Sequence, residues 1–133
     1  MRNDKPTNKG RHLNSRHIRP TIGFLTHGLL DNYSMLLWNG VMDATQEEDA
    51  NLICFLGRSL ESPRGFEAQA NILYDLVSAE TVDGLVLSSS ALSHFVGQEG
   101  LRTFCERYAP LPMVSIAVPL EGIHSIVVSG LVV

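Results

Sequence analysis

The chain has 133 residues, of which 44% are hydrophobic and 18% are charged, and its formal net charge is −4. These values are typical of a single globular domain and argue against a disordered, a membrane-spanning or a strongly basic protein. Two cysteines are too few for a disulfide framework. No apolar run is long enough for a membrane helix or a signal sequence, so we expect a cytoplasmic protein without membrane attachment.

The charge is divided unevenly along the chain. Residues 1–19 contain six basic residues and one acidic residue, whereas the remainder contains four basic and 13 acidic residues. Residues 1–18 also contain few apolar side chains, so we expect a disordered basic tail, either an arm for nucleic acid or anionic lipid or a plain linker. The acidic remainder is a poor surface for phosphates, and no direct nucleic-acid binding is expected from it.

The first predicted strand, Thr21–Thr26, ends in a polar loop that contains a glycine. A helix follows that begins at about Asn32 and is regular over 34–48, because its apolar residues recur on one face. A second strand is predicted at Asn51–Leu56. The buried face of the helix is predicted to contain Leu37, Trp38, Val41, Met42 and Thr45.

The second half of the chain continues the alternation. Helices are predicted over 66–79 and 98–108, and strands over 85–87, 113–118 and 126–128. The buried stripes of these two helices are predicted to be Phe66, Ala70, Leu73 and Val77, and Leu101, Phe104, Cys105 and Tyr108.

Strands that alternate with helices predict an α/β fold. We expect a doubly wound, mostly parallel sheet in the order 2-1-3-4-5, with helices on both faces. Ligands of such sheets bind beyond the carboxyl ends of the strands.

Several catalytic and cofactor motifs are missing from the sequence. There is no glycine-rich nucleotide motif and no G-x-S-x-G elbow. Serine follows the third strand, where a phosphoryl-accepting receiver domain needs a carboxylate. His27, Asp31 and His94 could lie near strand ends, but a metal site needs at least three converging ligands with an orienting second shell. We therefore expect no metal, no cofactor and no catalytic residue.

A series of short segments carries a resemblance to a known family. The most specific is Val82-Asp83-Gly84-Leu85-Val86-Leu87, around the third strand. The other matching segments, in chain order, are 21–25, 36–44, 51–54, 69–76, 111–114 and 126–128. In this order and spacing, residues 19–129 resemble the N-terminal lobe of the lactose-repressor-like, type I periplasmic-binding-protein superfamily.

The resemblance implies one lobe of a two-lobe fold that clamps a small ligand, such as a sugar or nucleoside, by a hinge motion. Residues 19–133 would then be a truncated lobe, with the second lobe or an output domain missing from this chain. The uncovered sheet edge would invite association, so a homodimer is one expectation. The implied function is non-catalytic ligand sensing in a transcription regulator or a signal-transduction protein.

The sequence departs from the family pattern at its usual sugar contacts. Tyr33 is the only aromatic residue left in the loop where many members carry a pair. Ala117 and Val118 stand where sugar-binding members carry Asp-Arg, and Ser129 stands where Asp is common. These departures count against sugar specificity.

The candidate ligand contacts follow the predicted strands. Tyr33 offers a flat ring, or else caps the helix at the surface. His27 offers a hydrogen bond, or is simply solvated, and Arg58 offers a cation for an anion. Hydroxyl and backbone N–H groups of three serines offer hydrogen bonds, or serve only a turn. These serines are Ser88, Ser89 and Ser90.

Two other classes of protein remain open. A solute-binding component of a transporter predicts an export signal upstream. A small flavodoxin-like enzyme predicts turnover that depends on His27 or Ser89.

Overall fold

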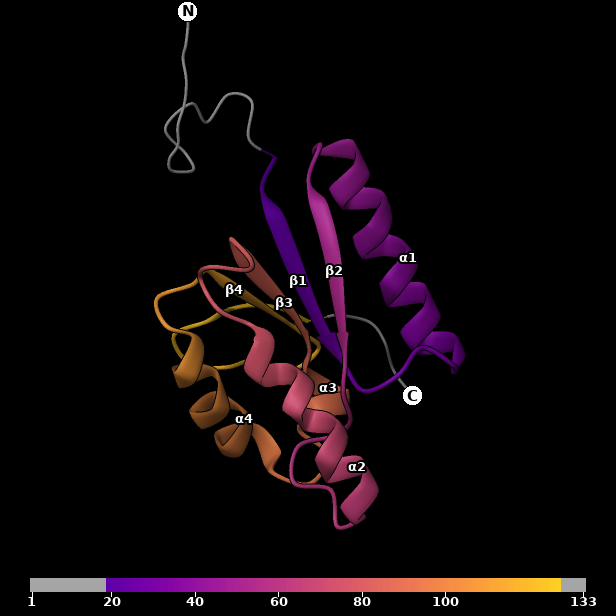
Figure 1. The fold of residues 1–133 in the computed structure, drawn as a ribbon, viewed down its shortest axis with the longest axis vertical. Coiled ribbons are helices and arrows are strands. Elements are labelled where there is room, and N and C mark those ends of the chain that lie inside the picture. Colours follow the sequence, from indigo (N-terminus) through magenta and orange to yellow (C-terminus); the bar gives the residue numbers. More distant parts are fainter. Residues whose placement is uncertain (1–18, 128–133) are drawn as a thin grey trace, which may run out of the picture.

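The computed structural model describes residues 19–127, which form a five-stranded parallel sheet with helices on both faces (Figure 1). The strand order is β2-β1-β3-β4-β5, as predicted. The predicted basic tail, residues 1–18, lies outside the described residues, as do Val128 and Ser129. The strands are β1 Thr21–Thr26, β2 Asn51–Leu56, β3 Gly84–Ser88, β4 Met113–Ile116 and β5 His124–Ile126.

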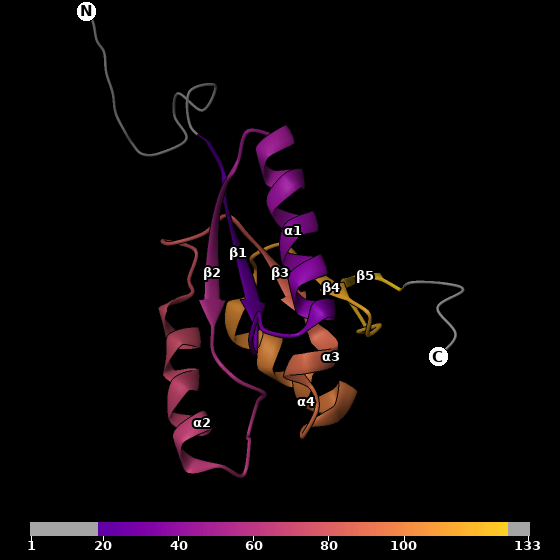
Figure 2. The same cartoon turned by 90° about the vertical axis from the view of Figure 1, so that its right-hand side faces the viewer.

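Neighbouring residues of β1 show how the two faces are used. Successive side chains of a strand point to opposite faces, and both Phe24 and Leu25 are fully buried. Phe24 packs against Trp38 of α1 (Asn32–Glu47), with 6.0 Å between the ring centroids. Leu25 joins the main core on the other face, under α2 (Gly65–Ala70) and α4 (Gly97–Cys105). Figures 1 and 2 show this division, with α1 on one side of the sheet and α2 and α4 on the other.

Helix α1 confirms its predicted face. Leu37, Trp38, Val41 and Met42 are partly buried and Thr45 is buried. The helix begins at Asn32, because the side chain of the preceding residue, Asp31, accepts the backbone N–H of Ser34 at 2.8 Å. An aspartate in this position satisfies one of the free donors at a helix start.

The helix predicted over 66–79 was wrong in form and in its buried stripe. The chain forms α2 and then a 3₁₀ helix, η2 (Asn71–Leu76). Phe66 is 71% exposed and Leu73 is 37% exposed, while Tyr74 and Val77 are buried. The buried face of this segment is centred on Tyr74. The Tyr74 ring packs on the bare backbone of Gly57, where an added Cβ would lie 2.6 Å from the Tyr74 hydroxyl oxygen.

The strand and helix predicted over 85–87 and 98–108 are confirmed, and the structure adds a short helix between them. β3 is buried apart from half-buried Val86, as a central parallel strand should be. A short helix that was not predicted, α3 (Ser89–Leu92), follows directly. α4 then continues as a 3₁₀ helix, η3 (Glu106–Tyr108), and the predicted face of this helix is confirmed.

The last two strands differ from the predicted bounds. β4 ends at Ile116, two residues early, because Ala117 has a φ of 80° and cannot continue the strand. β5 begins at His124, after a turn at Gly122 with a φ of 81°. It therefore starts two residues before the predicted strand 126–128 and shares Ile126 with it. Within residues 19–127, no helix has the length and hydrophobicity needed to cross a membrane.

Candidate functional site

The loops after β1, β2 and β3 meet at the carboxyl edge of the sheet and line two adjoining cavities, of about 550 and 440 Å³. His27, Ser59 and Glu67 line both cavities, so we treat them together as one cleft. β1 lies between β2 and β3, so the order of the strands reverses beside it. Open α/β sheets bind ligands at such a reversal.

The loop from His27 to Asp31 forms the first wall of the cleft. The backbone N–H of Ser34, helped by the nearby His27, holds the pKa of Asp31 below its ordinary value. The Nδ1 atom of His27 is buried and has no hydrogen-bond partner among residues 19–127. The predicted contact residue His27 therefore lies at the cleft with one ring nitrogen unsatisfied.

Arg58, another predicted contact residue, stands at the end of β2 and lines the smaller cavity. Its Nη1 donates to the carbonyl oxygen of His27 at 2.7 Å, so its side chain reaches across to the loop after β1. Its backbone N–H donates to the Asn71 side chain at 2.6 Å, which fixes the main chain beneath it. Arg58 is half-buried, with its main chain held by Asn71 and its guanidinium by the His27 carbonyl.

The segment that leads into α2 forms the second wall. Glu67 accepts from the Ser62 hydroxyl at 2.8 Å and pairs with Arg64 at 3.3 Å. The Ser62 bond, with a smaller effect from Arg64, lowers the pKa of Glu67 from its ordinary value. The carboxylate is therefore anionic at neutral pH and tied to its own segment.

The third wall is formed by α3 and the residues after it. Ser90, a predicted contact residue, lines the larger of the two cavities of the cleft. Ala91, His94 and Phe95 line the same cavity. The Ser59 hydroxyl donates to the Ala91 carbonyl at 2.8 Å and so ties the second wall to the third. The rings of His94 and Phe95 meet edge to face, with 4.6 Å between centroids, and Phe95 is 48% exposed. It gives the cleft a flat apolar surface.

The other two predicted serines lie in the interior. Ser88 is 1% exposed, and its hydroxyl has no partner within the described part of the chain. Ser89 is fully buried, with its hydroxyl 2.6 Å from that of Ser115 in β4. Neither side chain lines the cleft: Ser88 is the buried last residue of β3, and Ser89 is the buried first residue of α3.

Tyr33 lies in the first turn of α1 and is 41% exposed. Its side chain is not among those that line the two cavities. Ring stacking by Tyr33 stays a prediction that would need a ligand extending beyond the cleft.

Several cleft residues were not found from the sequence. Ser59, Arg64 and Glu67 belong to a long loop and a helix start whose path no periodicity describes. His94, which was predicted to lie near a strand end but not to contact a ligand, is exposed and lines the cleft. No periodic signal marks His94 either, because it lies in the turn between α3 and α4.

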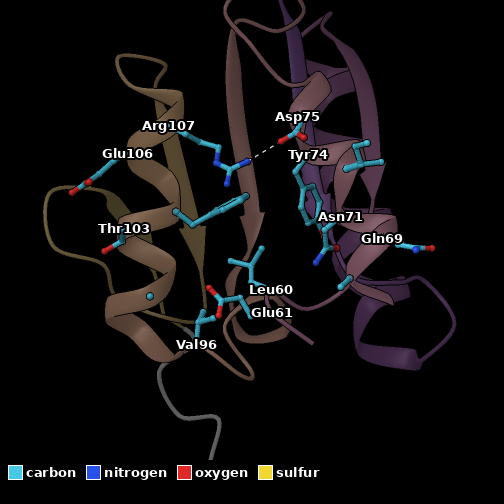
Figure 3. A pocket seen from close by; sticks show the side chains of 14 residues that line it. Leu60, Glu61, Gln69, Asn71, Tyr74, Asp75, Val96, Thr103, Glu106 and Arg107 are labelled. Atoms are coloured by element: carbon cyan, nitrogen blue, oxygen red, sulfur yellow. Dashed lines mark hydrogen bonds and ion pairs between the residues drawn. The ribbon is translucent and has the colours of Figure 1, made fainter. Parts of the chain in front are cut away.

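A larger cavity, of about 1020 Å³, runs between η2 and α4 on the face away from α1 (Figure 3). Three of its polar side chains have partners: Asn71 accepts the backbone N–H of Arg58, and Arg107 pairs with Asp75 at 3.0 Å across one end. We regard it as a groove between packed helices and call it the helix groove.

No protein-family model and no curated protein matches the chain. The geometry of the cleft and the five-stranded parallel sheet that carries it are therefore the basis for its function.

Proposed function

We propose that residues 19–127 act as a small-ligand-sensing lobe, without catalysis, in a protein that regulates transcription or transduces a signal. The observation that carries this proposal is the cleft, where three loops converge at the reversal of strand order. A concave cleft that combines apolar surface, including the exposed ring of Phe95, with a few polar groups is typical of small-molecule sites.

The resemblance to the N-terminal lobes of lactose-repressor-like proteins supports the same function. In that arrangement the lobe supplies one wall of a clamp, and a second lobe closes on the ligand. Closure over the cleft would then report ligand occupancy to an output domain. The regulatory role rests on this resemblance and on the position of the cleft together.

The non-catalytic part of the proposal is supported by the bonds of two cleft side chains, Ser59 and Glu67. The Ser59 hydroxyl is committed to the carbonyl of Ala91, and Glu67 is committed to Ser62 and Arg64. General acid–base chemistry needs a group that is within reach of the reacting proton. Groups that are bonded in this way hold the loops in position.

The test is a titration of the full chain with pools of small sugars, nucleosides and amino acids, followed by ¹H–¹⁵N NMR. We expect weak binding, because one wall alone encloses a ligand only in part. The amide signals of residues 27–31, 57–59 and 90–95 should shift together. Shifts confined to residues that line the helix groove would contradict the proposal, as would the absence of any shift across all pools.

A pair of matched substitutions locates the site. Ala91→Phe places a ring in the larger cavity of the cleft and should abolish the shifts. Ala68→Phe places the same ring at the helix groove and should leave them unchanged. If Ala68→Phe abolished the shifts and Ala91→Phe left them unchanged, the ligand site would lie in the helix groove.

A further inference from the structure

The carboxylates of the cleft are already occupied by donors of the protein. Both oxygens of Glu67 are engaged, Oε1 by the Ser62 hydroxyl at 2.8 Å and Oε2 by Arg64 at 3.3 Å. Both oxygens of Asp31 are engaged by Ser34, through its backbone N–H at 2.8 Å and its hydroxyl at 3.0 Å. Glu67 therefore has its own cationic partner, and Asp31 is held by neutral donors of Ser34.

Arg58 is satisfied in a different way. Its Nη1 donates to the carbonyl oxygens of His27 at 2.7 Å and Gly57 at 3.4 Å, and it forms no ion pair with a carboxylate in the stretch 19–127. Carbonyl oxygens fix the guanidinium but do not neutralise it. Within residues 19–127 the Nε–H and Nη2–H groups, which share one edge of the planar fork, form no hydrogen bond, and such an edge can donate two parallel hydrogen bonds to an anion.

The position of this cation increases its effect on a ligand. Arg58 is half-buried, and Gly28 leaves room beside it, because an added Cβ there would lie 3.7 Å from Nη1. Attraction between charges is stronger in a partly buried site than in open water. The adjoining cavity supplies apolar surface from Pro63, Ala91 and Phe95.

We propose that the cleft takes a small organic anion, whose carboxylate or phosphate group binds the Nε–H and Nη2–H edge of Arg58 while its body lies toward Phe95. This inference rests on the proposed function, because it names the class of ligand for the same cleft. Glu67 already has a cationic partner in Arg64, whereas Arg58 forms no ion pair within residues 19–127.

The test compares matched pairs of probes at constant ionic strength on the full chain. Glucose 6-phosphate is compared with glucose, and benzoate with benzamide, by ¹H–¹⁵N NMR at the amides of 27–31, 57–59 and 90–95. Each anion should bind at least about tenfold more tightly than its neutral partner, since a bidentate bond to arginine adds both charge and geometry. The phosphate and carboxylate pairs show which anionic group is preferred.

Substitutions assign the preference to one side chain. Arg58→Gln should remove the tenfold preference, and Arg58→Lys should keep part of it, because lysine keeps the charge but loses the fork. Arg102→Gln in α4 is the matched control: it removes an equal charge that is paired with Glu99 and Glu106, outside the cleft, and should change nothing. Thermal unfolding of each variant confirms that it is folded.

The outcomes separate this inference from the proposed function. Equal shifts of the cleft amides by anionic and neutral probes would overturn the anion preference and leave ligand sensing in place. Anion effects confined to amides outside the cleft, for which the basic residues of 1–18 are a ready source, would also overturn it. Failure of every probe and every pool at the cleft would overturn both.

Discussion

The hydroxyl oxygen of Tyr74 lies 3.0 Å from the carbonyl oxygen of Arg58, so the ring that borders the helix groove also braces the strand end that carries the cleft cation. The same hydroxyl lies 3.2 Å from the carbonyl oxygen of Thr26, at the end of β1. Tyr74 is 1% exposed, and its single proton is therefore shared between two strand ends that water does not reach.

Tyr74→Phe should lower the free energy of unfolding by about 1–3 kcal/mol, because it leaves buried carbonyl oxygens without a donor. Urea denaturation measures this loss. Tyr33→Phe removes the same atom from an exposed ring and should change the stability by less than about 0.5 kcal/mol. Equal losses in the two variants would show that the buried hydroxyl has no special role.

Gly57→Ala should also destabilise the protein, by about 1–3 kcal/mol, because a core without space must shift to admit a methyl group. The added Cβ would lie 2.6 Å from the Tyr74 hydroxyl oxygen and 2.8 Å from its Cε2. Gly40→Ala is the control, since nothing lies within 4 Å of a Cβ at this position in α1. There the change should stabilise the helix by about 0.5–1 kcal/mol. Thermal or urea unfolding should move in opposite directions for the two variants.

The parts of the fold that were predicted correctly depend on local patterns. β1 and β2 match their predicted bounds because each is a short apolar run between polar turns. The face of α1 follows from a period that one helix carries by itself. The buried face of η2 could not be predicted, because it depends on the space above Gly57, which is 17 residues from Tyr74 in sequence and in contact with it in space.

The candidate site was predicted in part for a similar reason. His27, Arg58 and Ser90 line the cleft because each follows a strand end, and the strand order brings those ends together. Ser88 and Ser89 have the same residue type and nearly the same position as Ser90, yet they are buried. Composition does not show that a helical turn begins there and rotates successive serines to different sides.

Ser89→Ala and Ser90→Ala should therefore have different effects. Ser89 shares a buried hydrogen bond with Ser115, and its loss should lower the free energy of unfolding by about 1–2 kcal/mol without changing ligand affinity. Ser90 is exposed at the cleft, so its loss should leave stability within about 0.5 kcal/mol and weaken any ligand that bonds to its hydroxyl. Urea unfolding and NMR titration of both variants check this, and a ligand effect from Ser89→Ala alone would contradict it.

Alkaline pH should destabilise the protein, in part through two buried groups of the core around α4. Burial raises the pKa of the Cys105 thiol from 9.0 to about 11 and that of the Tyr108 hydroxyl from 10.0 to about 12. Both groups keep their protons in the folded protein at a pH where the unfolded chain has lost them. The stability that they contribute is fully present below pH 9 and is lost as the pH rises toward 11 and 12.

The loss between pH 9 and 11 should be on the order of 2 kcal/mol, since one pKa unit corresponds to about 1.4 kcal/mol. Urea unfolding at pH 8, 9, 10 and 11 measures it. Both lysines of the chain lie within residues 1–18. Within residues 19–127, the change of unfolding free energy with pH in this range therefore comes from cysteine and tyrosine side chains. Cys105→Ala should be less stable at pH 8 but should show a shallower slope from pH 9 upward. A slope that is unchanged in Cys105→Ala and in Tyr108→Phe would assign the alkaline sensitivity to other groups.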